Sequence, residues 1–374
     1  MIEILDTTLR DGEQTSGVSF SNHEKLSVTR ILLDDVKVNR IEVASARVSA
    51  GEYESVKRIM SWAKVHQHLE KIEVLGFVDG KISVDWISST GGKILNLLCK
   101  GSLKHVTEQL AKKPEEHAND IKKVVEYAQS KGINVNVYLE DWSNGMKNSP
   151  EYVYFMIDKL KLLPIKRFML PDTLGILHPD ETYRFCKDMI DRYPNLHFDF
   201  HAHNDYDLSV ANVYSAIKAG VKGIHTTVNG LGERAGNAPL SSVQAVIHDL
   251  LGEKTTIQEY ELNHASKLVE TYSGIRIPAN KPVVGENVFT QCAGVHADGD
   301  NKNNLYFNEL LPERFGRERV YALGKTSGKA NIKKNLESLG VELDEETMKL
   351  VTERIIELGD KKEVVTQEDL PYII

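Results

Sequence analysis

The sequence predicts an α/β protein, a TIM (β/α)8 barrel with a mainly helical extension at its C-terminal end. Eight short apolar segments rich in β-branched residues alternate with longer segments whose apolar residues recur at helical spacing. The eight units occupy about 250 residues, the usual length of such a barrel. A doubly wound open sheet shares this local pattern, but no glycine-rich dinucleotide loop follows the first segment.

The predicted elements follow one another from the N-terminus to about residue 275. The strands are expected at residues 2–9, 40–45, 71–78, 93–100, 134–141, 167–173, 197–204 and 223–230. The clearest helices between them are expected at residues 21–35, 115–132, 179–195 and 207–220, and several end on a glycine or asparagine, as helix C-termini often do. Beyond them the pattern stops, so we expect a barrel domain at 1–275 and an extension at 276–374.

The composition is that of a soluble globular protein. Hydrophobic residues make up 41% and charged residues 27% of the 374 residues, and the net charge of −8 is spread along the chain. We therefore expect neither nucleic acid nor a membrane as a partner. The chain starts on a strand pattern without the features of a signal peptide, and its three cysteines suit a reducing compartment, so we expect a cytoplasmic protein.

Polar residues gather where the predicted strands end. In a TIM barrel the active site lies at the carboxyl ends of the strands, and an evenly solvated barrel would scatter such groups over both rims. The residues at these ends include Arg10, Asp11, Glu42, Ser45, Asn96, Tyr138, Glu140, Asp172, Thr173, His201, His203 and Asn229. This distribution predicts a functional site at that rim.

The segment "FHAHND" at 200–205 places two histidines one residue apart on a strand. Because strand side chains alternate, His201 and His203 point the same way with Cβ atoms roughly 6.5 to 7 Å apart, a workable span for one metal ion. Alternatively, the pair is a polar edge satisfied by water or backbone. Asp11 can add a carboxylate, and Asn237 in the glycine-rich loop after the last strand can add an amide oxygen. Such mixed ligands suit a catalytic divalent ion: zinc, manganese or magnesium.

Five motifs carry a resemblance to a known family: "DTTLRDGEQT", "LPDTLG", "HAHNDYDLSVAN", "NGLGERAGNAPL" and "AGVHADG". Together they resemble the metal-dependent TIM-barrel enzymes that condense acetyl-CoA with 2-oxo acids, the isopropylmalate, homocitrate and citramalate synthases. The match runs across nearly the whole chain in the family's order. Within the family, "EVLGFVDG", "NLLCKGS" and "NVYLEDWSNG" look most like bacterial (R)-citramalate synthases, which use pyruvate.

The resemblance implies an acyltransferase of branched-chain amino acid biosynthesis and assigns roles to individual residues. Asp11, His201, His203 and Asn237 bind the metal. Arg10, Tyr138 and Thr173 hold the 2-oxo acid, and Glu140 lies close to the reacting methyl group of acetyl-CoA.

The reaction itself requires these residue types, independently of the resemblance. A metal that chelates the carboxylate and ketone of a 2-oxo acid polarises the carbonyl, and Arg10 can stabilise the alkoxide that forms. A base must remove a proton from the methyl group, and Glu140 is the candidate. Alternatively, Glu140 is a structural carboxylate that orients Arg10 or Tyr138.

The pocket for the side chain of the oxo acid distinguishes the members of the family. Leu75 and Leu98 end strands at the place where the resemblance puts these contacts. Two leucines leave space for a methyl group and offer no cation to a distal carboxylate, which favours pyruvate over 2-oxoisovalerate and makes homocitrate synthesis the least expected reaction. Alternatively, both leucines belong only to the barrel core.

In the family, the extension packs across a homodimer and lends residues to the partner's site. His296, Asp298 and Tyr306 are therefore candidates for work on the CoA thioester, although His296 in "AGVHADG" can instead cap a turn. We expect no C-terminal regulatory domain: either the enzyme lacks one or it has been removed.

The sequence argues against three other functions. A lyase of the hydroxymethylglutaryl-CoA type would carry a cysteine in the glycine-rich loop, and "GLGERAGNAPL" has none. A biotin-dependent carboxyltransferase would offer a lysine near "LPDTLG". A metal-binding protein without enzymatic activity would have no use for Arg10, Tyr138 and Glu140.

Overall fold

The computed structural model describes residues 1–300 and 302–374, and the chain divides into two compact units. The first unit comprises Met1–Ile277 and the second Pro278–Ile374. Each unit buries hydrophobic residues of its own. Among the residues described, no helix is both long and apolar enough to cross a membrane.

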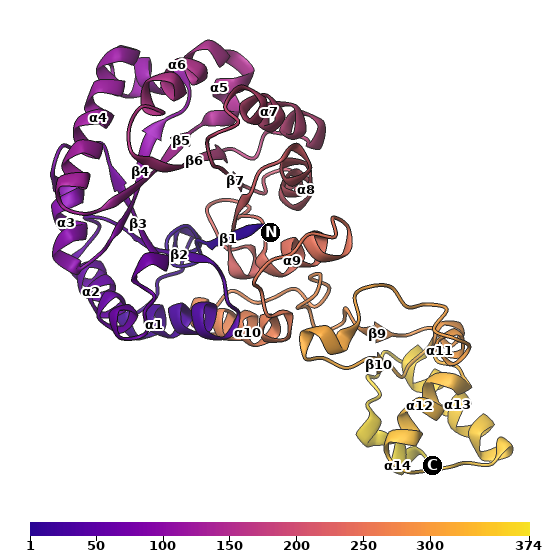
Figure 1. Ribbon diagram of the computed structural model, residues 1–374. Helices are drawn as coiled ribbons and strands as arrows, with labels where there is room; N and C mark the ends of the chain where they lie inside the picture. The colour runs from indigo at the N-terminus through magenta and orange to yellow at the C-terminus, as the bar shows by residue number, and fades with distance from the viewer. The chain divides into compact units, whose positions relative to one another are not determined.

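The first unit is a closed barrel of eight parallel strands in chain order, surrounded by helices (Figure 1), which confirms the predicted TIM barrel. The strands are β1 Glu3–Asp6, β2 Arg40–Ser45, β3 Ile72–Phe77, β4 Ile94–Lys100, β5 Asn134–Glu140, β6 Ile165–Asp172, β7 Phe198–Ala202 and β8 Gly223–Thr226. The barrel closes where β1 pairs with β8, from Glu3 opposite Gly223 to Asp6 opposite Thr226. All eight carboxyl ends therefore lie on one rim.

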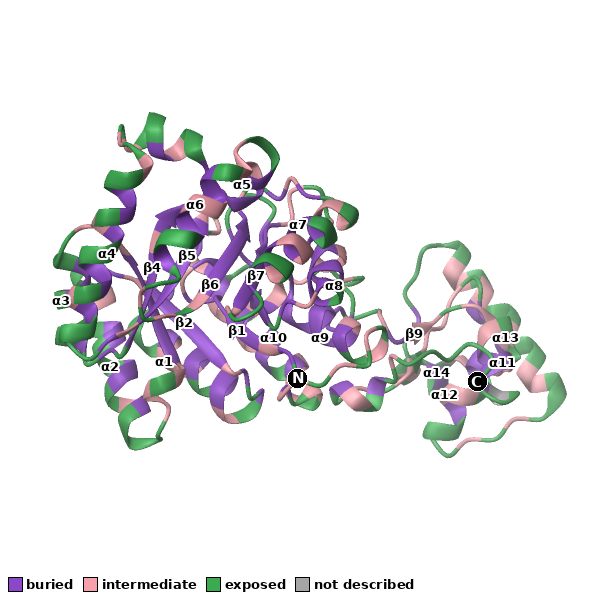
Figure 2. Cartoon of the chain, turned by 45° about the horizontal axis from the view of Figure 1, so that its top comes forward, coloured by how far each residue is buried: buried purple, intermediate pink, exposed green. Residues whose placement is uncertain are grey.

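The helices of the barrel unit bury one face against the strands and expose the other (Figure 2). They are α1 Asn22–Arg30, α2 Ala50–Val65, α3 Ile82–Thr90, α4 Pro114–Ser130, α5 Trp142–Asn148, α6 Pro150–Leu160, α7 Pro179–Arg192, α8 Ser209–Ala219, α9 Leu240–Asp249 and α10 Leu262–Ser273. Ser21 starts α1 through a capping box with Glu24, and a π-helical turn at Ile31–Asp35 follows this helix. Gly220 ends α8 in the left-handed conformation.

The interior of the barrel contains charged and polar side chains where aliphatic residues usually dominate. Arg40 on β2, Glu73 on β3 and Asp199 on β7 are each no more than 5% exposed. The guanidinium of Arg40 donates to Glu73 at 2.9 Å and to Asp199 at 2.5 Å. Because β2 and β7 are not neighbours in the barrel, the pair between Arg40 and Asp199 crosses its interior. Buried charges are tolerated only when they are paired in this way.

The second unit is mainly helical, as the sequence predicts for the extension. Its helices are α11 Gly294–Asn301, α12 Lys329–Ser338, α13 Glu345–Asp360 and α14 Leu370–Ile373. Its core is formed by buried residues of the last three helices and the segment before α14: Ile332, Leu336, Val351, Ile355, Val365 and Leu370. A two-stranded parallel sheet of β9 Thr290–Gln291 and β10 Val320–Tyr321, not expected from the sequence, completes the unit.

Candidate active site

A pocket of about 200 Å³ opens at the rim where the barrel strands end. Residues on or after all eight strands line it: Arg10, Asp11, Gln14, Ser45, Leu75, Phe77, Leu98, Tyr138, Glu140, Pro171, Thr173, His201, His203 and Glu233. Drug-sized ligands occupy pockets of about 300 to 1,000 Å³, so this one suits a small metabolite. The barrel thus brings most of the residues singled out in the sequence to one place.

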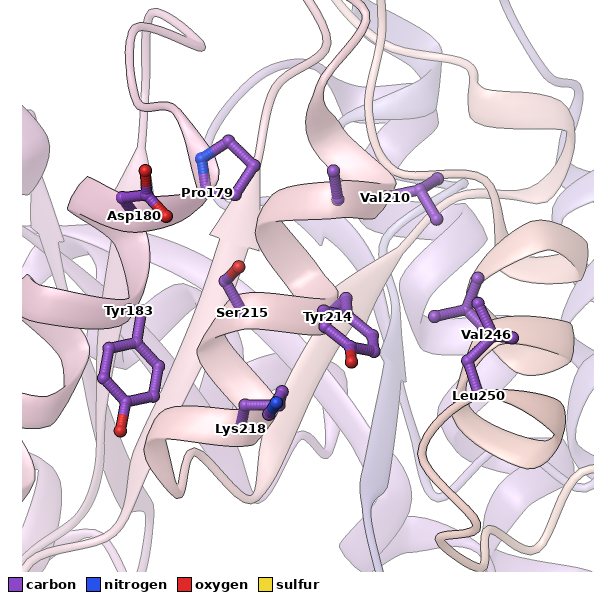
Figure 3. A pocket seen from close by; sticks show the side chains of 10 residues that line it. Pro179, Asp180, Tyr183, Val210, Tyr214, Ser215, Lys218, Val246 and Leu250 are labelled. Atoms are coloured by element: carbon purple, nitrogen blue, oxygen red, sulfur yellow. The ribbon is translucent and has the colours of Figure 1, made fainter.

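A larger hollow of about 800 Å³ lies in the outer helical layer, between α7, α8 and α9 (Figure 3). Tyr183, Tyr214 and Leu250 are among the side chains around it. None of the residues predicted for the site lines this hollow. The convergence of titratable groups favours the smaller pocket as the active site.

Asp11, His201 and His203 form a buried cluster at the rim, and their candidate ligand atoms all lie within 4.8 Å of one another. Asp11 follows β1, His201 lies on β7 and His203 follows that strand. The Nε2 atom of His201 is 3.3 Å from the Oδ2 atom of Asp11. These spacings allow one cation to contact all three side chains.

Buried polar atoms without a partner mark the same place. Among the residues that the structure describes, no hydrogen-bond partner is found for four buried atoms: Asp11 Oδ1, His201 Nδ1, His203 Nδ1 and Asn237 Oδ1. Leaving one such atom unsatisfied costs about 1 to 3 kcal/mol, whereas a cation would satisfy several at once. The residues present therefore fit a divalent metal ion.

Asn237 is brought to the cluster by the glycine-rich loop after β8, where its backbone bridges to that of His203. Its Nδ2 atom donates to the carbonyl of Leu231 at 3.0 Å, so its Oδ1 atom remains the free acceptor. A Cβ atom on Gly232 would lie 2.1 Å from that Nδ2 atom. The loop therefore requires glycine at this position.

The electrostatics of the cluster favour binding of a cation. Burial lowers the pKa of both histidines, that of His203 to about 4. Burial by itself raises the pKa of Asp11, but Arg10 and the two histidines outweigh it and hold that pKa well below its usual range. At neutral pH the cluster thus presents a carboxylate and two neutral imidazoles, the protonation states that ligate metals.

Arg10 is held beside this cluster by three acceptors. Its Nε atom donates to Glu42 at 2.5 Å, Nη1 to Asp11 at 3.0 Å and Nη2 to the Tyr138 hydroxyl at 3.4 Å. Burial by itself lowers the pKa of Arg10, but the carboxylates of Glu42 and Asp11 raise it by more. The guanidinium therefore stays charged. The sequence placed Glu42 at a strand end without assigning it this partner, because the contact joins residues 32 positions apart.

Glu140 forms an ion pair with Lys100, which lies opposite it in the register of β4 and β5. As an alternative role, the sequence suggested that Glu140 orients Arg10 or Tyr138. In the structure, Glu42 binds Arg10, and Lys100 binds Glu140. Lys100 was not among the predicted site residues, although its position two residues after Leu98 puts it on the same face of the strand.

Leu75 and Leu98 line the pocket and also belong to the barrel core. Leu75 packs with Leu5, Tyr138 and Met169, and Leu98 packs against this cluster. The two roles considered for the leucines are therefore not exclusive. Phe77, which the sequence analysis did not single out, adds an aromatic wall opposite Leu98 in the register of β3 and β4.

Thr173 lies at the pocket just after β6, and its hydroxyl accepts from the backbone N–H of Asp141 at 2.9 Å. The three remaining candidates belong to the second unit. The ring centroids of His296 and Tyr306 are 4.3 Å apart, and Asp298 pairs with Lys302 at 2.6 Å.

A closed parallel barrel whose rim gathers a carboxylate, two imidazoles and an arginine defines a metal-dependent TIM-barrel enzyme. A family model described as HMGL-like matches residues 1–269, and one described as a homocitrate synthase post-HMGL domain matches residues 283–363. The chain belongs to the HMGL-like family, in its branch of acyltransferase synthases, which confirms the resemblance drawn from the motifs.

Two relatives illustrate this branch. A putative (R)-citramalate synthase of Methanopyrus kandleri is 36% identical over the whole chain, which spans 72% of that relative. A probable 2-isopropylmalate synthase of Ignicoccus hospitalis is 35% identical over the whole chain and 91% of its own length. The barrel also superposes on a Bacillus subtilis HMG-CoA lyase structure with a TM-score of 0.61, at 20% identity and covering 76% of this chain and 96% of that one. This last likeness shows the fold.

Proposed function

We propose that the protein is a citramalate synthase. It condenses acetyl-CoA with pyruvate and then uses water to hydrolyse the thioester, giving citramalate and free CoA. The observation that carries this proposal is the small pocket in which Leu75, Phe77 and Leu98 stand beside the cluster of Arg10 and the candidate metal ligands. The similarity to a putative (R)-citramalate synthase over the whole chain supports it.

Asp11, His201, His203 and Asn237 would hold the divalent ion. When bound, such an ion supplies Lewis-acid polarisation of the ketone of the 2-oxo acid. Arg10, fixed by Glu42 and Tyr138, presents its positive charge to the oxygen that becomes the alkoxide.

Tyr138 and Thr173 line the same pocket and position the 2-oxo acid. Glu140 acts as the base that takes a proton from the methyl group of acetyl-CoA, after which the methyl carbon attacks the ketone carbon of pyruvate. Lys100 restrains the carboxylate of Glu140 through their ion pair. This restraint keeps the base at the end of β5, where the two substrates meet.

A 2-isopropylmalate synthase is the alternative, favoured by the relative from Ignicoccus hospitalis. The two reactions differ only in the acceptor, which carries a methyl group in pyruvate and a branched side chain in 2-oxoisovalerate. Two leucines and a phenylalanine around a pocket of about 200 Å³ leave little room for the branched chain. Homocitrate synthesis is less favoured, because none of these wall residues offers a cation to a second carboxylate.

A lyase of the HMG-CoA type is not proposed, although the barrel shares its fold. None of the three cysteines lines the pocket. Cys99 and Cys186 are buried, and burial raises the pKa of both thiols far above its usual range. Neither thiol is therefore available for acid–base chemistry at the rim.

A thiol-release assay tests the proposed function. The metal-loaded protein is incubated with acetyl-CoA and, in turn, pyruvate, 2-oxobutyrate, 2-oxoisovalerate and 2-oxoglutarate. We expect free CoA to appear fastest with pyruvate, more slowly with 2-oxobutyrate and slowest with the branched and dicarboxylic acids. Fastest turnover of 2-oxoisovalerate would instead identify a 2-isopropylmalate synthase.

Enlarging the pocket is expected to change the preferred acceptor. Leu98→Ala or Leu75→Val should improve the catalytic efficiency for 2-oxoisovalerate relative to pyruvate by roughly 10- to 200-fold, the range that a methylene or two is worth in an apolar pocket. Leu97→Ala is the matched control, because Leu97 is fully buried and on the opposite face of β4. It should lower stability without changing the acceptor ratio. An unchanged ratio in both pocket variants would place the leucines in the core alone.

We also propose that the protein is a homodimer in which His296, Asp298 and Tyr306 act at the partner's barrel, on the CoA thioester. Two inactive variants, Arg10→Ala and Tyr306→Ala, should then regain activity when they are co-assembled, because a mixed dimer can contain one intact site. Activity is measured on heterodimers isolated with two affinity tags. Heterodimers that remain inactive would contradict a shared site.

A further inference from the structure

Eight side chains inside the barrel form a closed ring of hydrogen bonds that begins and ends at Arg10. In order, they are Arg10, Glu42, Asn96, Glu73, Arg40, Asp199, His225 and Tyr138. Two of its members, Arg10 and Tyr138, line the active-site pocket. The other six lie deeper in the barrel or at its wall, so the ring connects the pocket to buried charges.

His225 on β8 closes this ring and was not singled out in the sequence. Its Nε2 atom is 3.1 Å from Asp199 Oδ2, and its Nδ1 atom is 3.0 Å from the Tyr138 hydroxyl. All three residues are no more than 2% exposed. Both ring nitrogens are therefore engaged by protein groups.

The directions of these two hydrogen bonds follow from the partners. Asp199 forms a buried ion pair with the guanidinium of Arg40, whose Nη2 atom donates to the Oδ2 atom of Asp199 at 2.5 Å. An ionised carboxylate only accepts hydrogen bonds, so the hydrogen of His225 is on Nε2. In a neutral imidazole, Nδ1 is then an acceptor, and the Tyr138 hydroxyl donates to it.

We propose that His225 is a positioning residue of the 2-oxo acid site: by accepting the Tyr138 hydroxyl hydrogen, it turns the oxygen lone pairs of that hydroxyl toward Arg10. This inference rests on the proposed function of the pocket. Asp199 fixes the tautomer of His225, and the tautomer in turn fixes the hydroxyl. The buried ion pair of Arg40 and Asp199 thereby influences a substrate-binding arginine that it does not touch.

This orientation of the Tyr138 hydroxyl leaves two N–H donors of Arg10 for a ligand. A guanidinium has five N–H donors, and Glu42, Asp11 and Tyr138 each engage one of them. One N–H on each Nη atom remains for a ligand in the pocket. If the Tyr138 hydroxyl hydrogen pointed at Arg10 instead, two donors would face each other, and the guanidinium would lose the acceptor that holds Nη2.

His225 could also have a purely structural role, in which it only donates a hydrogen bond to buried Asp199. In that case the loss of this donor, and not the loss of the acceptor for Tyr138, would have the larger effect. Two amides separate the roles, since asparagine places an amide oxygen near the position of Nδ1 and glutamine places an amide nitrogen near that of Nε2. His225→Asn keeps the acceptor for Tyr138 and loses the donor to Asp199. His225→Gln does the reverse.

The experiment measures the dissociation constant of pyruvate by calorimetry on the metal-loaded protein, in the oligomeric state in which it is purified. The KM values for pyruvate and acetyl-CoA are measured on the same samples. We expect His225→Gln to weaken pyruvate binding about tenfold, the loss of roughly one hydrogen bond, and His225→Asn to change it less than about threefold. The KM for acetyl-CoA should stay the same in both. Thermal unfolding and metal content provide the folding controls.

The same variants are measured again with Tyr138→Phe, which removes the hydroxyl. The effect of His225→Gln on pyruvate binding should then disappear, because no hydroxyl remains to be oriented. This comparison also distinguishes the positioning role from the structural role if His225→Asn does not fold. Equal effects of the two amides, the reverse order, or an effect that persists with Tyr138→Phe would overturn the positioning role. Wild-type protein that binds no 2-oxo acid and releases no thiol would instead overturn the proposed function and, with it, this inference.

Discussion

Replacing His203 with alanine is expected to remove the bound metal and to lower turnover by at least about a thousandfold. His203 is one of three buried candidate ligands whose ligand atoms lie within 4.8 Å of one another, and its Nδ1 atom has no hydrogen-bond partner among the described residues. Loss of one ligand from such a site weakens the hold on the ion, and polarisation of a ketone by a metal is worth several kcal/mol of transition-state stabilisation. Each 1.4 kcal/mol corresponds to about a factor of ten in rate.

Two readouts are needed for this prediction: metal content by elemental analysis and turnover by thiol release. His264→Ala is the matched control, since His264 lies on α10 with its side chain 67% exposed and pairs with Glu261, the residue before that helix. It should retain both metal and activity. Full activity of His203→Ala, or of wild-type protein after chelation and removal of the metal, would rule out the metal-dependent mechanism.

Replacing Lys25 with methionine is expected to lower the free energy of unfolding of the barrel unit by about 3 to 5 kcal/mol. The ammonium group of Lys25 is fully buried. It pairs with Glu13 at 2.7 Å and with Glu52, and it donates to the carbonyl of Leu9 at 3.2 Å. Removing one partner from a buried ion pair leaves uncompensated charge, which is why the cost exceeds that of the lost contact.

Lys25 also restrains the segment that carries two site residues. Lys25 binds both the carbonyl of Leu9 and the carboxylate of Glu13, and Arg10 and Asp11 lie between these two residues in the chain. Lys25→Met should therefore lower turnover as well as stability, because the segment with Arg10 and Asp11 is no longer restrained. The folded fraction must be matched before the rates are compared.

Denaturant unfolding followed by tryptophan fluorescence measures the stability effect, since Trp62, Trp86 and Trp142 all belong to the barrel unit. Lys122→Met is the control, because the pair between Lys122 and Glu126 is more than half exposed on both sides and should contribute no more than about 1 kcal/mol. Adding Glu52→Gln to Lys25→Met should recover part of the loss. Equal stability of Lys25→Met and Lys122→Met would show that the buried pair contributes nothing.

Local patterns in the sequence were enough to predict the barrel and the rim on which its candidate site lies. Period-two and helical spacing follow from backbone geometry, so the eight strands could be located, and their carboxyl ends share one rim in any parallel barrel. His201 and His203 share a strand face, so their proximity did not depend on the rest of the fold. Phe77 could have been found by the same rule, as it follows Leu75 by two residues.

Only the tertiary structure decided which side chains become partners across the barrel. Glu42 binds Arg10, Lys100 binds Glu140, and Asp199 binds Arg40 and His225, at separations of 26 to 159 residues. These pairs depend on the register of neighbouring strands and on contacts across the interior, which no local pattern encodes. The sequence by itself therefore predicted the rim of the barrel that carries the candidate site and most of the residues that line its pocket. The closed barrel determined how each charge is balanced, because a buried charge is stable only beside the partner that the fold brings to it.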